Sequence, residues 1–165
     1  PGTVIVADAI DAPSGQMATD SAWSERIASA LRVALPGTPF ARGVLAAVAA
    51  PVVTQQQKAA LHARTGALAV DMESHIAAAQ AGARGLPFTV CRVVVDPAGR
   101  TLPPAAMVGL RDDGTTALGP ILRELARAPA QLPAMIRLAF DALAARASLV
   151  AARRALPHAG ALSAA

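Results

Sequence analysis

The sequence contains few aromatic residues, a single cysteine and no long apolar run. Aromatic residues make up 2% of the 165 residues and tyrosine is absent. Because there is also no glycine-arginine repeat or helix-turn-helix pattern, nucleic-acid binding is not expected. Cys91 cannot form an internal disulfide, which fits a small buried side chain in a reducing, cytoplasmic setting. No stretch reaches the roughly 18 consecutive apolar residues of a membrane span.

Several common catalytic and binding motifs are missing as well. The sequence has no GxGxxG turn, no Walker phosphate loop and no GxSxG turn. These absences argue against a dinucleotide-binding fingerprint, a P-loop and the usual serine-hydrolase nucleophile turn. The three histidines are scattered and the cysteine is single, so no metal site is predicted.

The elements that are present alternate between strands and helices. Strands are predicted over residues 2–8, 42–49, 67–70 and 87–95, and helices over residues 20–35, 55–64, 74–84, 115–128 and 131–154. This alternation indicates one α/β domain over residues 1–165, with a mainly parallel sheet. It is expected to end in a flexible tail over residues 155–165. Because the first strand begins almost at residue 1, we expect the chain to start inside a larger fold.

Three carboxylates follow two of the apolar runs. Asp71 and Glu73 come after the run 67–70, and Asp96 ends the run 87–95. Runs of this kind are typical of strands buried on both faces, and ligands of open α/β sheets bind outside the carboxyl ends of strands. Glu73 and Asp96 could therefore form a catalytic pair. Alternatively, Glu73 stabilises the first turn of a helix and Asp96 opens a turn with Pro97.

The residues around these carboxylates resemble a known family. The matching segments are Ala69-Val70-Asp71-Met72-Glu73-Ser74, the alanine-rich helix after it, Leu86-Pro87-Phe88 and Arg92-Val93-Val94-Val95-Asp96. Together they resemble the nucleoside phosphorylase and nucleosidase superfamily, of the purine nucleoside phosphorylase and uridine phosphorylase type. Residues 42–72 and the loop 96–104 look most like its hopanoid-associated branch, in which the inferred reaction removes adenine from adenosylhopane.

This resemblance implies a fold, an activity and partners. The implied fold is a three-layer α/β/α sandwich with extra C-terminal helices, lacking the family's N-terminal region, which carries much of its phosphate site. The implied enzyme is a pentosyltransferase that needs no cofactor, uses inorganic phosphate as co-substrate and forms a homo-oligomer. Its substrate would be a purine ribosyl compound linked to a lipid. The alternatives are a nucleosidase that hydrolyses adenosine-type nucleosides and a truncated or degenerate member without catalysis.

The resemblance also implies roles for individual residues. Glu73 would bind the ribose hydroxyls, because a carboxylate can accept from two neighbouring O–H groups. Met72 would pack on the sugar ring, and Asp96 would donate a proton to the departing purine at N7. Val95 stands where the family usually has serine, so one hydrogen bond near the base is expected to be absent. Asp71 is expected to be structural.

The C-terminal part of the sequence is basic. Residues 100–165 contain eight arginines against four acidic residues, so the net charge of +4 lies entirely there. The helix 131–154 mixes these arginines with large apolar residues. We favour a core helix with a solvated edge, and the alternative is a peripheral contact with the anionic inner face of a membrane.

Overall fold

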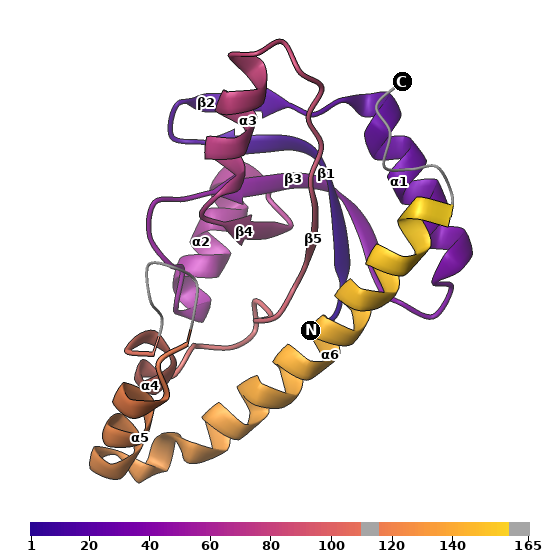
Figure 1. Ribbon diagram of the computed structural model, residues 1–165. Coiled ribbons are helices and arrows are strands. Elements are labelled where there is room, and N and C mark those ends of the chain that lie inside the picture. The colour runs from indigo at the N-terminus through magenta and orange to yellow at the C-terminus, as the bar shows by residue number, and fades with distance from the viewer. Residues whose placement is uncertain (110–115, 159–165) are drawn as a thin grey trace.

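The computed structural model describes residues 1–109 and 116–158, and shows helices around a central sheet (Figure 1). The strands are β1 (Val4–Ala12), β2 (Gly15–Ala18), β3 (Phe40–Ala47), β4 (Ala69–Asp71) and β5 (Cys91–Val93). The helices are α1 (Ser21–Ala34), α2 (Gln55–Thr65), α3 (Ser74–Gly82), α4 (Pro104–Met107), α5 (Leu118–Arg127), the 3-10 turn η1 (Pro129–Gln131) and α6 (Leu132–His158). The predicted α/β class and the C-terminal helices are confirmed.

The sheet is mixed rather than mainly parallel. Its strand order is β2-β1-β3-β4, and β5 pairs with β1. β3 is parallel to β1 and β4 is parallel to β3, whereas β2 and β5 are antiparallel to β1. The prediction of a mainly parallel sheet was therefore wrong. Two causes are the strand β2, which was not predicted and forms a hairpin with β1, and the reversed direction of β5.

One face of β1 is covered by α1 and α6, which lie side by side in Figure 1. Val4 and Val6 are at most 1% exposed, and they form a core cluster with residues of the two helices. The helical members of this cluster are Ile27, Leu31, Ala152 and Leu156. Trp23 packs against the cluster as a partly buried residue. A long C-terminal helix is thus anchored on the first strand of the sheet.

Two helices begin where the sequence predicts. The Asp20 side chain accepts a hydrogen bond of 2.8 Å from the Trp23 backbone N–H and caps α1. Thr54 and Gln57 form a capping box at the start of α2, each side chain accepting from the other's backbone N–H. Gly66 ends α2 with a φ of 68°, a conformation that glycine adopts without strain.

The two strands of the central unit are shorter and more exposed than predicted. β4 and β5 have three residues each. Leu68, Val70 and Val95, in or next to them, are 44%, 37% and 40% exposed. Burial on both faces was therefore a wrong prediction for these runs. The physical reason is that, among the described strands, β4 lies at the edge of the sheet beside β3 and β5 pairs with β1 over three residues, so neighbouring strands give little cover.

The C-terminal helices differ from prediction mainly at their ends. α5 begins at Leu118, and the predicted alternative start at Thr115 lies outside the described residues. α6 continues to His158, so residues 155–158 of the expected tail are helical, and the rest of that tail is outside the described residues. Within the described part of the chain, none of the helices combines the length and apolar character needed to cross a bilayer.

Candidate functional site

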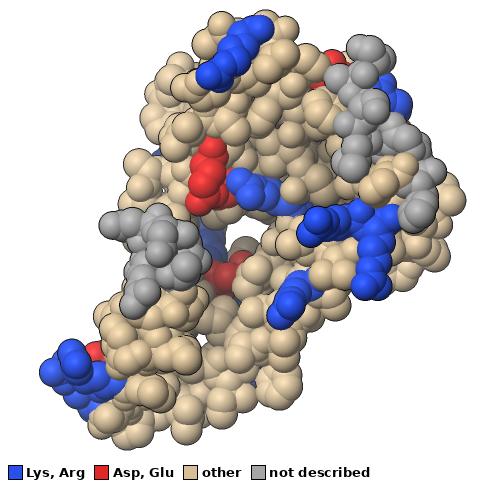
Figure 2. Space-filling model, in the orientation of Figure 1, with Lys and Arg blue, Asp and Glu red and all other residues tan. Residues whose placement is uncertain are grey.

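A cluster of charged and polar side chains lies where β4 ends and α3 begins. We call Asp71, Glu73, Ser74 and Arg92 the strand-end cluster. Arg92 reaches it from β5, with its Nε 2.7 Å from Asp71 Oδ2 and its Nη2 3.4 Å from Glu73 Oε2. Figure 2 shows acidic and basic side chains meeting on this face of the molecule. The cluster therefore joins β4 to a strand that sequence reasoning treated as apolar.

Asp71 has its hydrogen-bonding capacity largely filled. Its carboxylate accepts from the Ser74 backbone N–H at 3.0 Å, from the Ser74 hydroxyl and from Arg92. The Asp71 side chain is only 10% exposed. It supplies the cap that orients the start of α3, since Ser74 is the first residue of that helix. These contacts support the structural role expected for Asp71.

Glu73 is the open carboxylate of the cluster. It occupies the N-cap position of α3 but makes no side-chain capping hydrogen bond. Its side chain is 66% exposed, and its ion pair with Arg92 is the longest in the cluster. Glu73 therefore lies at the start of the helix, as the alternative predicts, but its side chain makes no capping hydrogen bond and is open to solvent. Met72, which precedes it, is half-buried. A solvent-accessible carboxylate held by one guanidinium can still accept hydrogen bonds from a ligand.

Asp96 belongs to a second cluster, which joins the segment after β5 to α2 and α6. We call Lys58, Asp96, Arg100 and Asp141 the loop–helix cluster. Lys58 Nζ contacts the Asp96 carboxylate and donates to the backbone oxygens of Arg100 at 2.7 Å and Pro97 at 3.3 Å. Arg100 forms an ion pair with Asp141, whose side chain is 10% exposed. Both carboxylates of this cluster are therefore engaged by cations.

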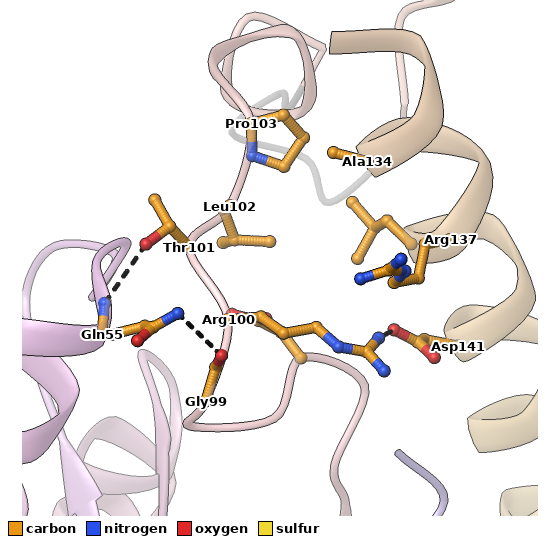
Figure 3. Close-up of a pocket in the computed structure, with 11 residues that line it drawn as sticks. Gln55, Gly99, Arg100, Thr101, Leu102, Pro103, Ala134, Arg137 and Asp141 are labelled. Atoms are coloured by element: carbon orange, nitrogen blue, oxygen red, sulfur yellow. Dashed lines mark hydrogen bonds and ion pairs between the residues drawn. The ribbon is translucent and has the colours of Figure 1, made fainter.

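A cavity of about 220 Å³ opens beside this cluster. Its walls come from the segment 96–103, from Gln55 at the start of α2 and from α6. Figure 3 shows the Arg100 side chain crossing it towards Asp141, while Arg137 of α6 points to the same region. The cavity is lined by backbone, charged groups and aliphatic side chains.

The structure does not bring Glu73 and Asp96 to the same end of the strands. Glu73 lies near the carboxyl ends of the parallel strands β3 and β4, and Asp96 lies near the start of β1. Asp71 pairs with Ala47 at the carboxyl end of β3, whereas Val93 pairs with Val4 at the opposite end of β1. Asp96 therefore lies beyond the start of β1, because β5 runs against β1, β3 and β4. Val95 lies just before it and is 40% exposed. The expectation that both carboxylates follow strands with the same direction was wrong.

Sequence reasoning missed the two cations that organise these clusters. Arg92 interrupts an otherwise apolar run, and Lys58 is the single lysine of a chain whose other basic residues are arginines. Both features were visible, but their partners lie 21 and 38 residues away in sequence. Long-range pairings of this kind depend on strand direction, which local patterns do not encode.

The Cys91 thiol and the possible metal ligands do not form a further candidate site in the described part of the chain. Burial raises the pKa of the Cys91 thiol to about 11, against an opposing influence of the Arg92 charge. Such a thiol stays protonated and unreactive near neutral pH. Within residues 1–109 and 116–158, no group of three or more His, Cys, Asp or Glu side chains is placed to hold a metal ion.

Comparison with known proteins gives matches of two kinds. A sequence model described as "Phosphorylase superfamily" matches residues 2–127. The solved structure of a 5′-methylthioadenosine/S-adenosylhomocysteine nucleosidase from S. pneumoniae, with a transition-state inhibitor, aligns with a TM-score of 0.55 and 17% identity over 94% of this chain. The nucleosidase of the same name from Neisseria meningitidis aligns with a TM-score of 0.54 and 20% identity over 59%. No curated protein matches the chain.

These structural matches establish a shared fold and a partial overlap. At 17% and 20% identity they carry no statement about activity. The chain spans 62% of the length of the S. pneumoniae nucleosidase and 50% of the N. meningitidis nucleosidase. The observed mixed α/β arrangement is therefore the nucleosidase-type fold over the part that this chain contains.

Proposed function

Because the chain belongs to the phosphorylase superfamily, we propose that it acts on the N-glycosidic bond of a purine ribosyl compound. The observation that supports this most directly is the contrast within the strand-end cluster. Asp71 is saturated by protein groups, whereas Glu73 is exposed and oriented by Arg92. An enzyme that holds a ribose needs such an accessible acceptor at a fixed position.

In this proposal Glu73 accepts hydrogen bonds from two neighbouring ribose hydroxyls. A carboxylate has enough lone pairs for both hydroxyls and for its long contact with Arg92. Met72, directly before it and half-buried, would pack its polarizable side chain on the sugar ring. Holding the ribose in this way would also place a negative charge near the sugar, where positive charge develops as the bond to the base breaks.

The departing purine requires a proton, and we propose Asp96 as its donor. Lys58 holds the Asp96 carboxylate in a part-buried ion pair, at the sheet edge opposite Glu73. The acid role therefore requires that Asp96 leave Lys58, that its carboxylate take up a proton from solvent, and that the segment 94–100 move towards the bound ribose. Asp96→Asn keeps the shape but cannot donate a carboxyl proton, so we expect it to lower adenine release by about 100-fold or more.

The finer reaction that we propose is phosphorolysis of adenosylhopane, with inorganic phosphate as the attacking group. Its support is the sequence resemblance to the hopanoid-associated branch. Hydrolysis is the second candidate, because the solved structures with this fold include nucleosidases. The products distinguish the two: phosphorolysis of adenosine yields ribose 1-phosphate only when phosphate is present, whereas hydrolysis yields free ribose with or without it. A protein that binds adenosine but releases no adenine in either condition would be a non-catalytic member.

Titration calorimetry with adenosine tests the ribose site directly. Losing a charge-assisted hydrogen bond typically costs about 1.5–3 kcal/mol, so Glu73→Gln is expected to weaken binding by about 10- to 100-fold. Glu25→Gln is the matched control, because Glu25 on α1 is also exposed and paired with arginines. Equal affinity for the wild type and Glu73→Gln would remove Glu73 from the site.

A further inference from the structure

Helix α6 has two faces with different surroundings. Its inner face contains the buried residues Asp141, Ala145, Ala152 and Leu156, which pack towards the sheet and the segment after β5. The turn of about 100° per residue places these four on one side of the helix. This face explains how α6 is held to the rest of the protein.

The opposite face carries a row of large apolar side chains. We call Leu132, Ile136, Phe140, Leu143 and Val150 the outer stripe; they are 48%, 49%, 67%, 61% and 39% exposed. At about 100° per residue, the stripe points about 180° away from the buried face. With a rise of about 1.5 Å per residue it extends for roughly 27 Å. Helix α6 thus has a buried face and a solvated one, as expected for a core helix with a solvated edge, but its solvated face is largely apolar.

The charges around the outer stripe have one sign. Arg146 and Arg153 lie on the same side of it, and Arg154 continues its line at the C-terminal end. All three are exposed. Asp141 is the sole acidic residue of α6, and it is buried against Arg100 on the inner face. Figure 2 shows basic side chains gathered along the C-terminal half of α6.

We propose that the outer stripe and its three arginines dock on the anionic surface of a lipid bilayer, with α6 lying in the plane of the interface. Such helices bury an apolar face at the headgroup boundary while cations meet anionic lipids. A second copy of α6 fits the surface less well, because it offers the arginines no acidic partner: Asp141, the sole acidic residue of α6, is buried on the inner face. The proposal rests on α6 and is independent of the reaction proposed for the strand-end cluster.

Co-sedimentation with vesicles tests the docking. The full chain is expected to bind phosphatidylcholine vesicles that contain phosphatidylglycerol and to bind pure phosphatidylcholine much less, with weaker binding at high salt. Leu143→Glu is expected to reduce binding by about tenfold or more, because it places a charge within the buried stripe. Ile76→Glu is the matched control: Ile76 is 57% exposed on α3, away from α6 in Figure 1, and its variant should bind like the wild type.

A second variant measures how much the arginines contribute to vesicle binding, separately from the apolar stripe. Arg153→Gln/Arg154→Gln is expected to weaken binding by about fivefold for each arginine removed and to reduce the dependence on salt. No binding at low salt, or equal loss in the Leu143 and Ile76 variants, overturns the proposal. So does a dimer, measured without lipid, that Leu143→Glu dissociates, because the stripe would then be a contact between two copies. Circular dichroism of each variant shows whether a loss of binding reflects a loss of fold.

Discussion

The strand-end cluster and the loop–helix cluster contain the same kinds of side chains but use them differently. In the loop–helix cluster every acidic side chain is paired: Asp96 with Lys58 and Asp141 with Arg100. These pairs tie the segment after β5 to α2 and α6. In the strand-end cluster one carboxylate, Asp71, is committed to the start of α3, while Glu73 is 66% exposed. The loop–helix cluster mainly holds the chain together, and the strand-end cluster leaves an acceptor free for a ligand.

This difference shows why a carboxylate in a motif cannot be assigned a role by type alone. Glu73 and Asp96 both follow apolar runs, and sequence reasoning gave them comparable importance. The structure distinguishes them by their neighbours: Lys58 is 9% exposed and binds Asp96 together with two backbone oxygens, whereas Arg92 is 42% exposed and contacts Glu73 at 3.4 Å. Variants of residues in the two clusters, and in the strand between them, measure that difference.

The largest effect is expected for Lys58→Met. The substitution leaves Asp96 without its cation and frees the backbone oxygens of Pro97 and Arg100. Breaking a buried ion pair by removing one partner typically costs about 3–5 kcal/mol, so we expect the free energy of unfolding to fall by about 3 kcal/mol. Urea denaturation followed by circular dichroism measures it.

The double variant Lys58→Met/Asp96→Leu is the control for that result. Replacing both members of a buried pair by apolar residues is often close to neutral. The double variant should therefore recover more than half of the stability lost in Lys58→Met. If it loses as much as the single variant, the ion pair is not the reason for the loss, and the loop–helix cluster is not held by its charges.

A smaller loss of stability is expected for Asp71→Asn. An amide oxygen still accepts from the Ser74 backbone N–H, but the charge that faces Arg92 is lost. Because the Arg92 side chain is 42% exposed, solvent screens part of that interaction, and we expect a loss of about 1–2 kcal/mol. A loss as large as that of Lys58→Met would mean that the two clusters do not differ in stability.

Where local signals decide a structure, the sequence was sufficient to predict it. The predicted helices 20–35 and 55–64 match α1 and α2 to within one residue at each end, because Asp20, Thr54 and Gly66 are local start and stop signals. Each of these features depends on residues within four positions of one another. The resemblance to a family came from short runs within residues 69–96, and the match of residues 2–127 confirms that family.

Where contacts between distant segments determine the structure, the sequence was not sufficient to predict it. Nothing within residues 87–95 states that β5 runs against β1, yet that direction moves Asp96 to the other sheet edge. A core helix with a solvated edge was predicted for α6, but composition does not say which of its apolar side chains lie on the exposed face. Phe140 at 67% exposure is the clearest example. Roles of Met72, Glu73, Val95 and Asp96 in binding or catalysis stay predictions.

Strand β5 connects the two clusters, and Cys91 at its start reports on its packing. Burial raises the pKa of this thiol from its ordinary value of 9.0 to about 11. Below pH 9 the thiol is protonated in both the folded and the unfolded chain. Between pH 9 and 11 the unfolded chain loses the proton first, so stability falls with rising pH, by about 1 kcal/mol at pH 10. The chain has no tyrosine to titrate in this range.

The test for Cys91 compares how steeply the free energy of unfolding falls with pH in the wild type and in a variant without the thiol. Urea denaturation between pH 8 and 10.5, at about half-unit steps, should show a steeper fall in the wild type than in Cys91→Ala. Parallel curves would show that the thiol is no harder to ionise in the fold than in the unfolded chain, and that β5 packs loosely between the clusters.

The smallest effect on stability is expected at the residue with the largest proposed effect on binding. Glu73→Gln removes a charge that is 66% exposed and whose nearest cation is at 3.4 Å. Exposed ion pairs contribute about 0–1 kcal/mol, so the free energy of unfolding should change by less than about 0.5 kcal/mol. Asp71→Asn, two residues away and facing the same guanidinium, is the internal reference because it should lose clearly more. A loss at Glu73 equal to that at Asp71 would show that both carboxylates serve the fold. Little change in stability combined with weaker adenosine binding would assign Glu73 to the ligand.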